Sequence, residues 1–222
     1  MKNEKKKSEG ELNFFEYILR AFVKPFEEFK KTEKNFSDQK NTLILGGIVV
    51  AILTALKLIG TIINTVRVTS ILGGTKWVFE NIKNINFIKT IGGSAITYAL
   101  IILAIAGVYY LASLVIKKET NFFKLMGASI TAFIPMAVST TLLSTLLSMI
   151  SIKLGVAVVI IGFIYSLLIL IELINYLIPI ENQNTKIYFH LTCLSLLFLT
   201  GAFIGYKMIV GSVTSGIGSF YN

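Results

Sequence analysis

Five long apolar runs decide what this chain can fold into. Each holds about 20 residues or more, the length that a helix needs to cross roughly 30 Å of bilayer hydrocarbon. Because the runs are continuously apolar rather than alternating in polarity, they predict helices and not barrel strands. We therefore expect an all-α integral membrane bundle of five transmembrane helices. The runs cover residues 43–66, 93–116, 125–150, 154–178 and 188–211.

The composition agrees with a chain that is surrounded mostly by lipid. Only 15% of its 222 residues are charged, where a soluble domain has about a quarter. The net charge of +9 does not indicate a nucleic-acid partner, because the chain has only two arginines, Arg20 and Arg67, and no basic patch with interleaved aromatics. The basic residues flank the apolar runs, where they anchor and orient helices.

The distribution of lysine and arginine predicts the orientation. With the N-terminus in the cytoplasm, and with residues far from the first run left out, the inner segments hold about nine basic residues against five in the outer segments. This bias places the N-terminus inside and the C-terminus outside a cell membrane. It divides the chain into a cytosolic segment (1–42), a membrane domain (43–211) and a short extracytosolic tail (212–222).

The stretch before the first run, "YILRAFVKPFEEFKK", predicts an amphipathic helix. Its aromatic residues recur at steps of three and four residues, and charged residues occupy much of the other face. Pro25 lacks a donor N–H and would kink or restart the helix. We expect this helix to lie along the inner leaflet; the alternative is a short cytosolic helix packed on the loops of the bundle. The expected membrane or partner contacts are Phe22, Pro25, Phe26 and Phe29. A second amphipathic piece, residues 76–91, is predicted to rest on the outer interface.

Two motifs resemble the Yip family, the Ypt/Rab-interacting-protein group of polytopic membrane proteins. The first is "KPFEEFKK", in which Pro25 is followed closely by phenylalanines, and the second is "NFFKLMGASITAFIPMAV", residues 121–138, with a basic residue and then Pro135. Five spans, with the N-terminus inside and the C-terminus outside, complete the resemblance, and residues 11–42 are expected to organise membrane or recruit a partner. The single aspartate, Asp38, departs from the acidic signatures of the eukaryotic trafficking members. The resemblance therefore points to a bacterial relative.

Three ionisable residues fall within the apolar runs: Lys57, Glu172 and Lys207. Charge in lipid is costly, so each is a functional hypothesis. Glu172 shares a helical face with Asn175, and His190 is expected at a comparable depth, which predicts an intramembrane polar cluster. Such a cluster would relay protons or hold a cation. The alternative, which we favour, is that Glu172 ties two helices together by a hydrogen bond.

Pro135, within the third run, predicts a helix kink. Catalytic motifs such as GxSxG or HExxH are absent from the sequence, and one histidine and one cysteine cannot build a metal site of those residues. The sequence therefore predicts no enzyme and no cofactor. We expect a membrane-organising or partner-recruiting adaptor. A small transporter or channel that uses Glu172 is the alternative, and an accessory subunit of a larger membrane complex is a further one.

Overall fold

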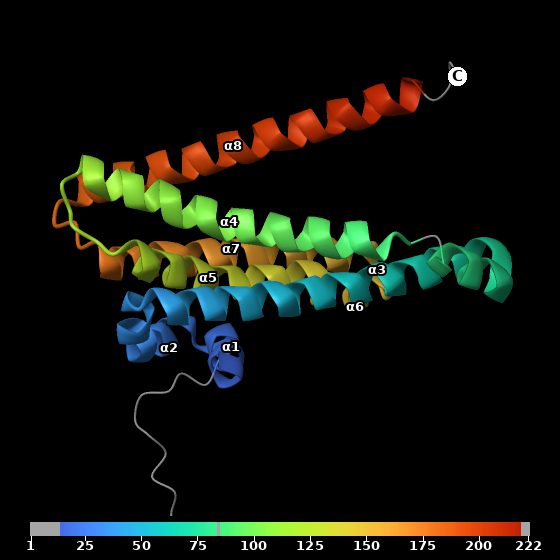
Figure 1. Ribbon diagram of the computed structural model, residues 1–222, viewed down its shortest axis with the longest axis horizontal. Helices are drawn as coiled ribbons and strands as arrows, with labels where there is room; N and C mark the ends of the chain where they lie inside the picture. The colour runs from blue at the N-terminus through green and yellow to red at the C-terminus, as the bar shows by residue number, and fades with distance from the viewer. Residues whose placement is uncertain (1–13, 84, 219–222) are drawn as a thin grey trace, which may run out of the picture.

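The computed structural model describes the backbone of residues 14–83 and 85–218, and the side chains of 16–67, 79–83 and 85–202. Long helices lie side by side, and two short helices pack beside them near one end (Figure 1). The described chain is helical, which confirms the all-α expectation. The elements run, in chain order, α1 (Phe14–Val23), α2 (Pro25–Thr32), η1 (Glu33–Ser37), α3 (Gln39–Lys83), α4 (Phe87–Val115), α5 (Phe122–Val138), η2 (Ser139–Leu143), α6 (Ser144–Ser148), α7 (Ile152–Leu177) and α8 (Gln183–Gly218).

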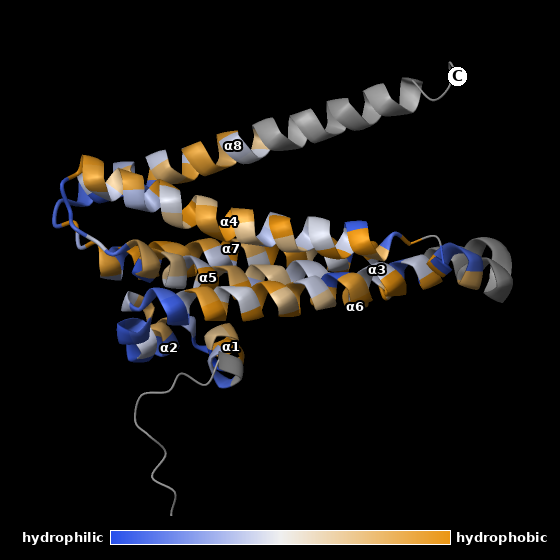
Figure 2. Ribbon diagram, viewed as in Figure 1, coloured by the Kyte–Doolittle hydropathy of each residue, from blue (hydrophilic) through white to orange (hydrophobic). Residues whose placement is uncertain are grey.

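Five helical stretches are long and apolar enough to cross a membrane, which confirms the predicted bundle. Their middles are apolar and their connections polar (Figure 2). The helix starts lie a few residues earlier than predicted, partly because polar side chains cap them: Asn86 accepts a hydrogen bond from the N–H of Lys89, and Asn121 accepts one from the N–H of Phe123. The candidate spans are Gln39–Arg67, Phe87–Val115, Phe122–Ser148, Ile152–Leu177 and Gln183–Ala202.

Two other predicted stretches also break or end at different residues in the structure. Residues 76–91 do not form one helix: α3 continues to Lys83, and α4 begins at Phe87 after a short break. The same stretch therefore supplies the end of one long helix and the start of the next. At the other end of the chain α8 continues to Gly218, past the predicted boundary at residue 211.

The third span, α5 with η2 and α6, lies at the centre of the bundle and packs against α3, α4 and α7. Glycines permit the closest approaches. A Cβ added to Gly162 of α7 would lie 2.3 Å from Cβ of Ser139, and one added to Gly155 would lie 2.9 Å from Cβ of Ser148. Small residues let membrane helices pack backbone to backbone, where van der Waals contact is the main attraction.

Pro135 lies inside α5 and is buried, and the helix widens to a π turn at Ser139. The proline removes one backbone donor from the helix, and such irregular turns are tolerated in membrane helices when neighbouring helices cover them. Here α7 covers the turn with Gly162. The predicted kink at Pro135 stays a prediction.

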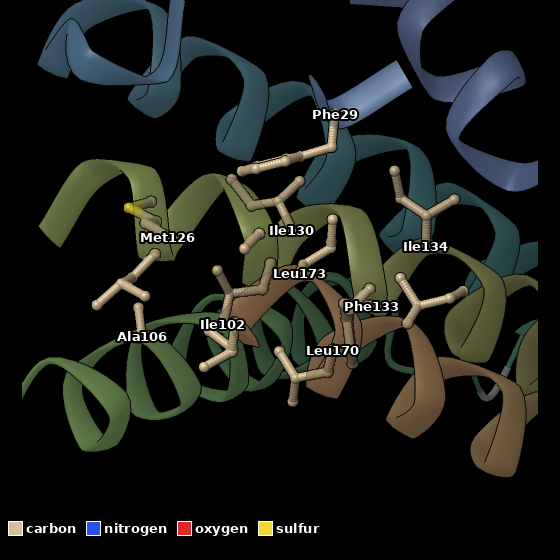
Figure 3. Close-up of a cluster of buried hydrophobic side chains, with 14 of the residues drawn as sticks. Phe29, Ile102, Ala106, Met126, Ile130, Phe133, Ile134, Leu170 and Leu173 are labelled. Carbon is tan, nitrogen blue, oxygen red and sulfur yellow. The ribbon is translucent and has the colours of Figure 1, made fainter. Parts of the chain in front are cut away.

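The apolar core lies on two sides of α5. Ile102 of α4 and Leu170 of α7 lie on one side of it, and Phe29 of the N-terminal segment lies on the other, next to Ile130 (Figure 3). The core thus joins the membrane bundle to a part of the chain that precedes the first span.

Candidate functional site

The candidate site lies where the N-terminal segment, α1 through η1, packs on the bundle. We call this the Lys124 end; it also holds the start of α3, the α4–α5 connection and the α7–α8 connection. The opposite end, with the α6–α7 connection, is the Lys153 end. In Figure 1, α1 and α2 lie beside α3 and α5 near the Lys124 end. Both α1 and α2 contact α5, and α2 also contacts α7.

Proline divides the segment into two helices. Pro25 is the first residue of α2, where its missing N–H has no intrahelical partner to lose. Because α1 ends at Val23, the chain changes direction there and presents aromatic side chains from both helices to α5. The expectation that Pro25 kinks or restarts the helix is met by a restart.

Aromatic side chains form the main docking contact. Phe29 and Phe36 are fully buried, and their rings stack with centroids 5.3 Å apart. Phe36 lies directly on Gly127 of α5, where an added Cβ would come within 2.6 Å of the ring. Only glycine leaves room for this ring against the helix backbone.

Tyr17 of α1 reaches furthest along the bundle. Its hydroxyl hydrogen-bonds Oγ1 of Thr131, which in turn donates to the carbonyl of Gly127 at 2.7 Å, so the tyrosine is the donor in the first bond. Burial raises the pKa of Tyr17, which keeps this donor protonated. Thr131 lies seven residues beyond Lys124, a helical rise of about 10 Å.

Polar contacts join the N-terminal segment to α5 and α7 at the Lys124 end. Nζ of Lys124 donates to Oε1 of Glu33 at 2.6 Å, and the hydroxyl of Tyr176 on α7 donates to Oε2 at 2.8 Å. Partial burial disfavours the charged carboxylate, but the hydrogen bonds from Lys124 and Tyr176 outweigh it and lower the pKa of Glu33. Nζ of Lys30 lies 4.3 Å from the ring centroid of Phe26 and 5.0 Å from that of Tyr176. We call these five residues the Glu33 clasp.

The opposite side of α1 is apolar and uncovered. Leu19 and Val23 are 57% and 69% exposed, and Phe22 is 36% exposed. We call these three residues the outer face of α1. Beside it, Glu16 and Arg20 form an exposed ion pair at 2.6 Å. The helix therefore has three sides: one on the bundle, one apolar and open, and one charged.

The four predicted contact residues thus separate into two groups. Pro25 and Phe29 are buried against the bundle, and Phe26 is half-buried in the Glu33 clasp. Phe22 alone lies on the outer face of α1. The segment packs on the spans themselves, and its expected placement along the inner leaflet stays a prediction.

The predicted intramembrane cluster is brought together in part. Nε2 of His190 lies 2.9 Å from Oδ1 of Asn175, and Nδ1 of the same ring lies 3.3 Å from the hydroxyl of Tyr109. These bonds join α4, α7 and α8. Glu172 is exposed on α7 and makes no hydrogen bond or ion pair with any described residue. The tie between helices therefore comes from Asn175 and His190, with Tyr109 as an unforeseen third member.

Two other ionisable residues were predicted within the apolar runs. Lys57 is exposed on α3, and the side chain of Lys207 lies outside the described residues. Nowhere in the described part of the chain do three His, Cys, Asp or Glu side chains come close enough to hold a metal ion.

Sequence reasoning missed most of the partners in the docking contact. Tyr17 shows no sign of its role apart from its place on an amphipathic helix, and Gly127 and Thr131 look like ordinary small residues of a span. One usable signal is the opposite charge of Glu33, about ten residues before the first apolar run, and Lys124, directly before the third. Because both residues are expected on the inner side of the membrane, their opposite charges are candidates for an ion pair.

Comparison with known proteins gives one match. The family model described as Yip1 domain matches residues 19–211, from the middle of α1 into α8. Neither the curated proteins nor the solved structures contain a match. The matched range includes most of the N-terminal segment as well as the five spans.

Proposed function

The chain belongs to the Yip1 domain family, and from that premise we propose that it organises one leaflet of its membrane by holding α1 within it. The observation that carries the proposal is the three-sided character of α1. One side is fixed to α5 through Tyr17, and the outer face, with Leu19 and Phe22 on it, has no protein cover among the described residues. A helix with these faces suits the boundary between headgroups and acyl chains.

Depth supports the same placement. Tyr17 bonds α5 about 10 Å beyond Lys124, and interfacial helices lie about 5–10 Å into the boundary between headgroups and chains. Glu16 and Arg20 lie on the flank of α1, from which their long side chains can extend to the headgroups. The bias of basic residues supports a cytoplasmic Lys124 end. Inserted into that leaflet alone, α1 would widen it relative to the other.

The experiment measures membrane shape. The full chain is reconstituted into vesicles of phosphatidylcholine and phosphatidylglycerol, and vesicle diameters are measured by electron cryomicroscopy. We expect narrower vesicles or tubules with the wild type than with Leu19→Ser/Phe22→Ser. The matched control is Ile88→Ser/Ile91→Ser, which changes two exposed apolar residues at the Lys153 end and should retain the effect. Equal diameters for the wild type and the α1 variant would refute a leaflet-organising role.

Recruitment of a protein partner through the same face is the second form of the adaptor hypothesis. It is distinguished by co-purification of a defined partner that depends on Leu19 and Phe22 while vesicle diameters do not. The transport alternative is not favoured, because Glu172 is exposed on α7 and forms no hydrogen bond with Asn175 or His190. Ion flux that is lost in Glu172→Gln would restore it.

A further inference from the structure

A second feature of the bundle lies on the side of α5 away from the N-terminal segment. An apolar cleft of about 630 Å³ opens between α4, α5, α7 and α8. Its walls come from the middle of each span, and the volume falls within the range of small-molecule sites in proteins, about 300–1,000 Å³. The residues that matter below are Ala104, Ser166, Leu167, Leu197, Phe198 and Gly201.

The cleft exists because α8 packs on α4 and leaves α7 largely uncovered. In Figure 1, α8 diverges from α4 along its length. The bridge between α7 and α8 at this level is an edge-on contact of Phe163 with Phe198, with ring centroids 5.9 Å apart. Phe198 is itself 55% exposed. The cleft is therefore continuous with the lipid-facing surface of the five spans.

We propose that this cleft holds the hydrocarbon chain of a membrane lipid. At the depth of the span centres, lipid chains are the available solvent. Water does not fill an apolar space of this kind, and a void would deprive its walls of dispersion contacts. At about 30 Å³ for each water-sized group, 630 Å³ has room for about 20 such groups, comparable to one lipid chain. The proposal is independent of the role of α1.

A helix of a second copy does not fit the space. A helix with its side chains is about 10 Å across, so a 630 Å³ cylinder of that width would be only about 8 Å long, or about five residues. A second copy that covered the mouth would close the cleft to bilayer lipid and leave its interior empty. A thin, flexible chain fills the interior and reaches it from the bilayer without unfolding the bundle.

The polar groups on the walls agree with a chain that carries no headgroup at this level. The hydroxyls of Thr97 and Thr200 bond the carbonyls of Gly93 and Leu196 in their own helices. Ser166 is 6% exposed and its hydroxyl has no hydrogen-bond partner among the described residues. One serine hydroxyl can turn to the carbonyl four residues earlier, here that of Gly162, as serines of membrane helices do. A ligand with a polar group at this depth would instead depend on Ser166.

The test uses the full chain in phosphatidylcholine vesicles that contain a phosphatidylcholine with a photoactivatable diazirine near the methyl end of one chain. After irradiation, labelled peptides are mapped by mass spectrometry. The measured quantity is the label on Leu167, which faces the cleft, relative to Leu168, which is 60% exposed on the outside of the same helix. We expect comparable labelling of the two. Label confined to Leu168 would overturn the proposal.

Variants separate the binding of a lipid chain in the cleft from general contact with the bilayer. Gly201 lines the cleft and has open space at its Cβ position, so Gly201→Phe fills the cleft without a clash; Gly93 has the same open space but does not line the cleft. We expect the Leu167 label to fall several-fold in Gly201→Phe and to stay unchanged in Gly93→Phe. Ala104→Phe fills the cleft from α4 and replaces Gly201→Phe in this test if that variant does not fold.

Two further results would contradict the proposal. Loss of the Leu167 label in Ser166→Ala would mean that the ligand is recognised by a hydrogen bond and is not a plain hydrocarbon chain. Retention of the label supports a hydrocarbon chain in the cleft. Efficient oxidative dimerisation of Leu197→Cys in a Cys193→Ser background would mean that a second copy covers the cleft.

Discussion

The N-terminal segment and α8 pack against the same bundle in contrasting ways. The segment buries Tyr17, Phe29 and Phe36 almost completely and adds the Glu33 clasp. In α8, only 17% of the most apolar window is buried, against 56% in the third span. A short segment outside the spans is thus more deeply buried against the bundle than the described part of a transmembrane helix.

The difference follows from the solvent. Between helices in lipid there is little hydrophobic driving force, because lipid chains are as apolar as leucine, so close packing and specific polar contacts decide which elements stay together. The segment has both, through Gly127 and Glu33. α8 has mainly the bonds of His190 with Asn175 and Tyr109, near its start. This comparison predicts that substitutions in the segment have larger effects than substitutions in α8.

Phe29→Ala should have the largest effect on the segment. Removing a fully buried phenylalanine costs about 3–5 kcal/mol, so the undocked fraction should rise by about 100-fold or more, at 1.4 kcal/mol for each tenfold change. Trypsin cleavage at Lys30 and Lys31 in nanodiscs measures that fraction when opening is faster than cleavage. Phe22→Ala, on the outer face of α1, is the matched control and should leave the rate nearly unchanged.

Gly127→Ala tests the close approach of Phe36. The added methyl would lie within 2.6 Å of the ring, and overpacking of this kind costs about 1–3 kcal/mol. We expect faster trypsin cleavage of the segment without loss of the spans. Gly47→Ala, where a Cβ meets nothing within 4 Å, should behave as wild type. Equal protection in both variants would mean that Phe36 does not lie on α5.

Glu33→Gln tests the clasp with a smaller expected effect. Hydrogen bonds to charged groups contribute about 1.5–3 kcal/mol, and the partial exposure of both Glu33 and Lys124 reduces this to about 1 kcal/mol. The same cleavage assay measures it. Glu27→Gln removes the exposed pair with Lys24 and should change nothing measurable.

Acid should weaken the Glu33 clasp, as Glu33→Gln does. The pKa of Glu33 is lower in the docked segment than in the free one, so its contribution is complete above the ordinary carboxyl pKa of about 4.3 and is lost as the pH falls through the lower docked value. Spin-label distances between the segment and α5, recorded from pH 7 to pH 3, should broaden only below about pH 4.3. Glu33→Gln should remove most of this change, and an unchanged profile in that variant would show that other groups cause it.

Leu194→Ala should have the smallest effect. Leu194 lies on the wall of the cleft and is half-buried, and a lipid chain can replace the contacts that it loses. We expect a loss below about 1 kcal/mol in the free energy of unfolding, measured by urea or dodecyl sulfate titration. Leu173→Ala, fully buried on α7, is the comparison and should cost about 3 kcal/mol. Equal losses would mean that α8 is packed as tightly as α7.

The sequence predicted the parts of the fold that depend on length and polarity. Five apolar runs gave five spans, and Pro25 marked the point at which the N-terminal helix restarts. The placement of residues 76–91 on the outer interface stays a prediction. Periodicity over this stretch did not show that one helix ends and another begins within it, where Asn86 caps the new helix.

The site was less predictable, because periodicity identifies an apolar face and not what covers it. The aromatic repeat of the segment contains both Phe29, buried on the bundle, and Phe22, which is partly exposed. Likewise, spacing places Glu172 and Asn175 on one helical face, yet His190 bonds Asn175 and not Glu172. The position of α8 decides which of the two residues His190 meets. Contacts between distant segments depend on tertiary packing that one sequence does not encode locally.

The most direct test of the docked segment is a distance measurement by pulsed electron paramagnetic resonance. Spin labels are placed at Val23, exposed at the end of α1, and at Lys118, exposed in the α4–α5 connection, in a Cys193→Ser background in nanodiscs. The account predicts one narrow distance distribution that broadens in Phe29→Ala and not in Phe22→Ala. A broad distribution in the unaltered segment, insensitive to Phe29, would mean that α1 moves freely and is not held in the leaflet by α5.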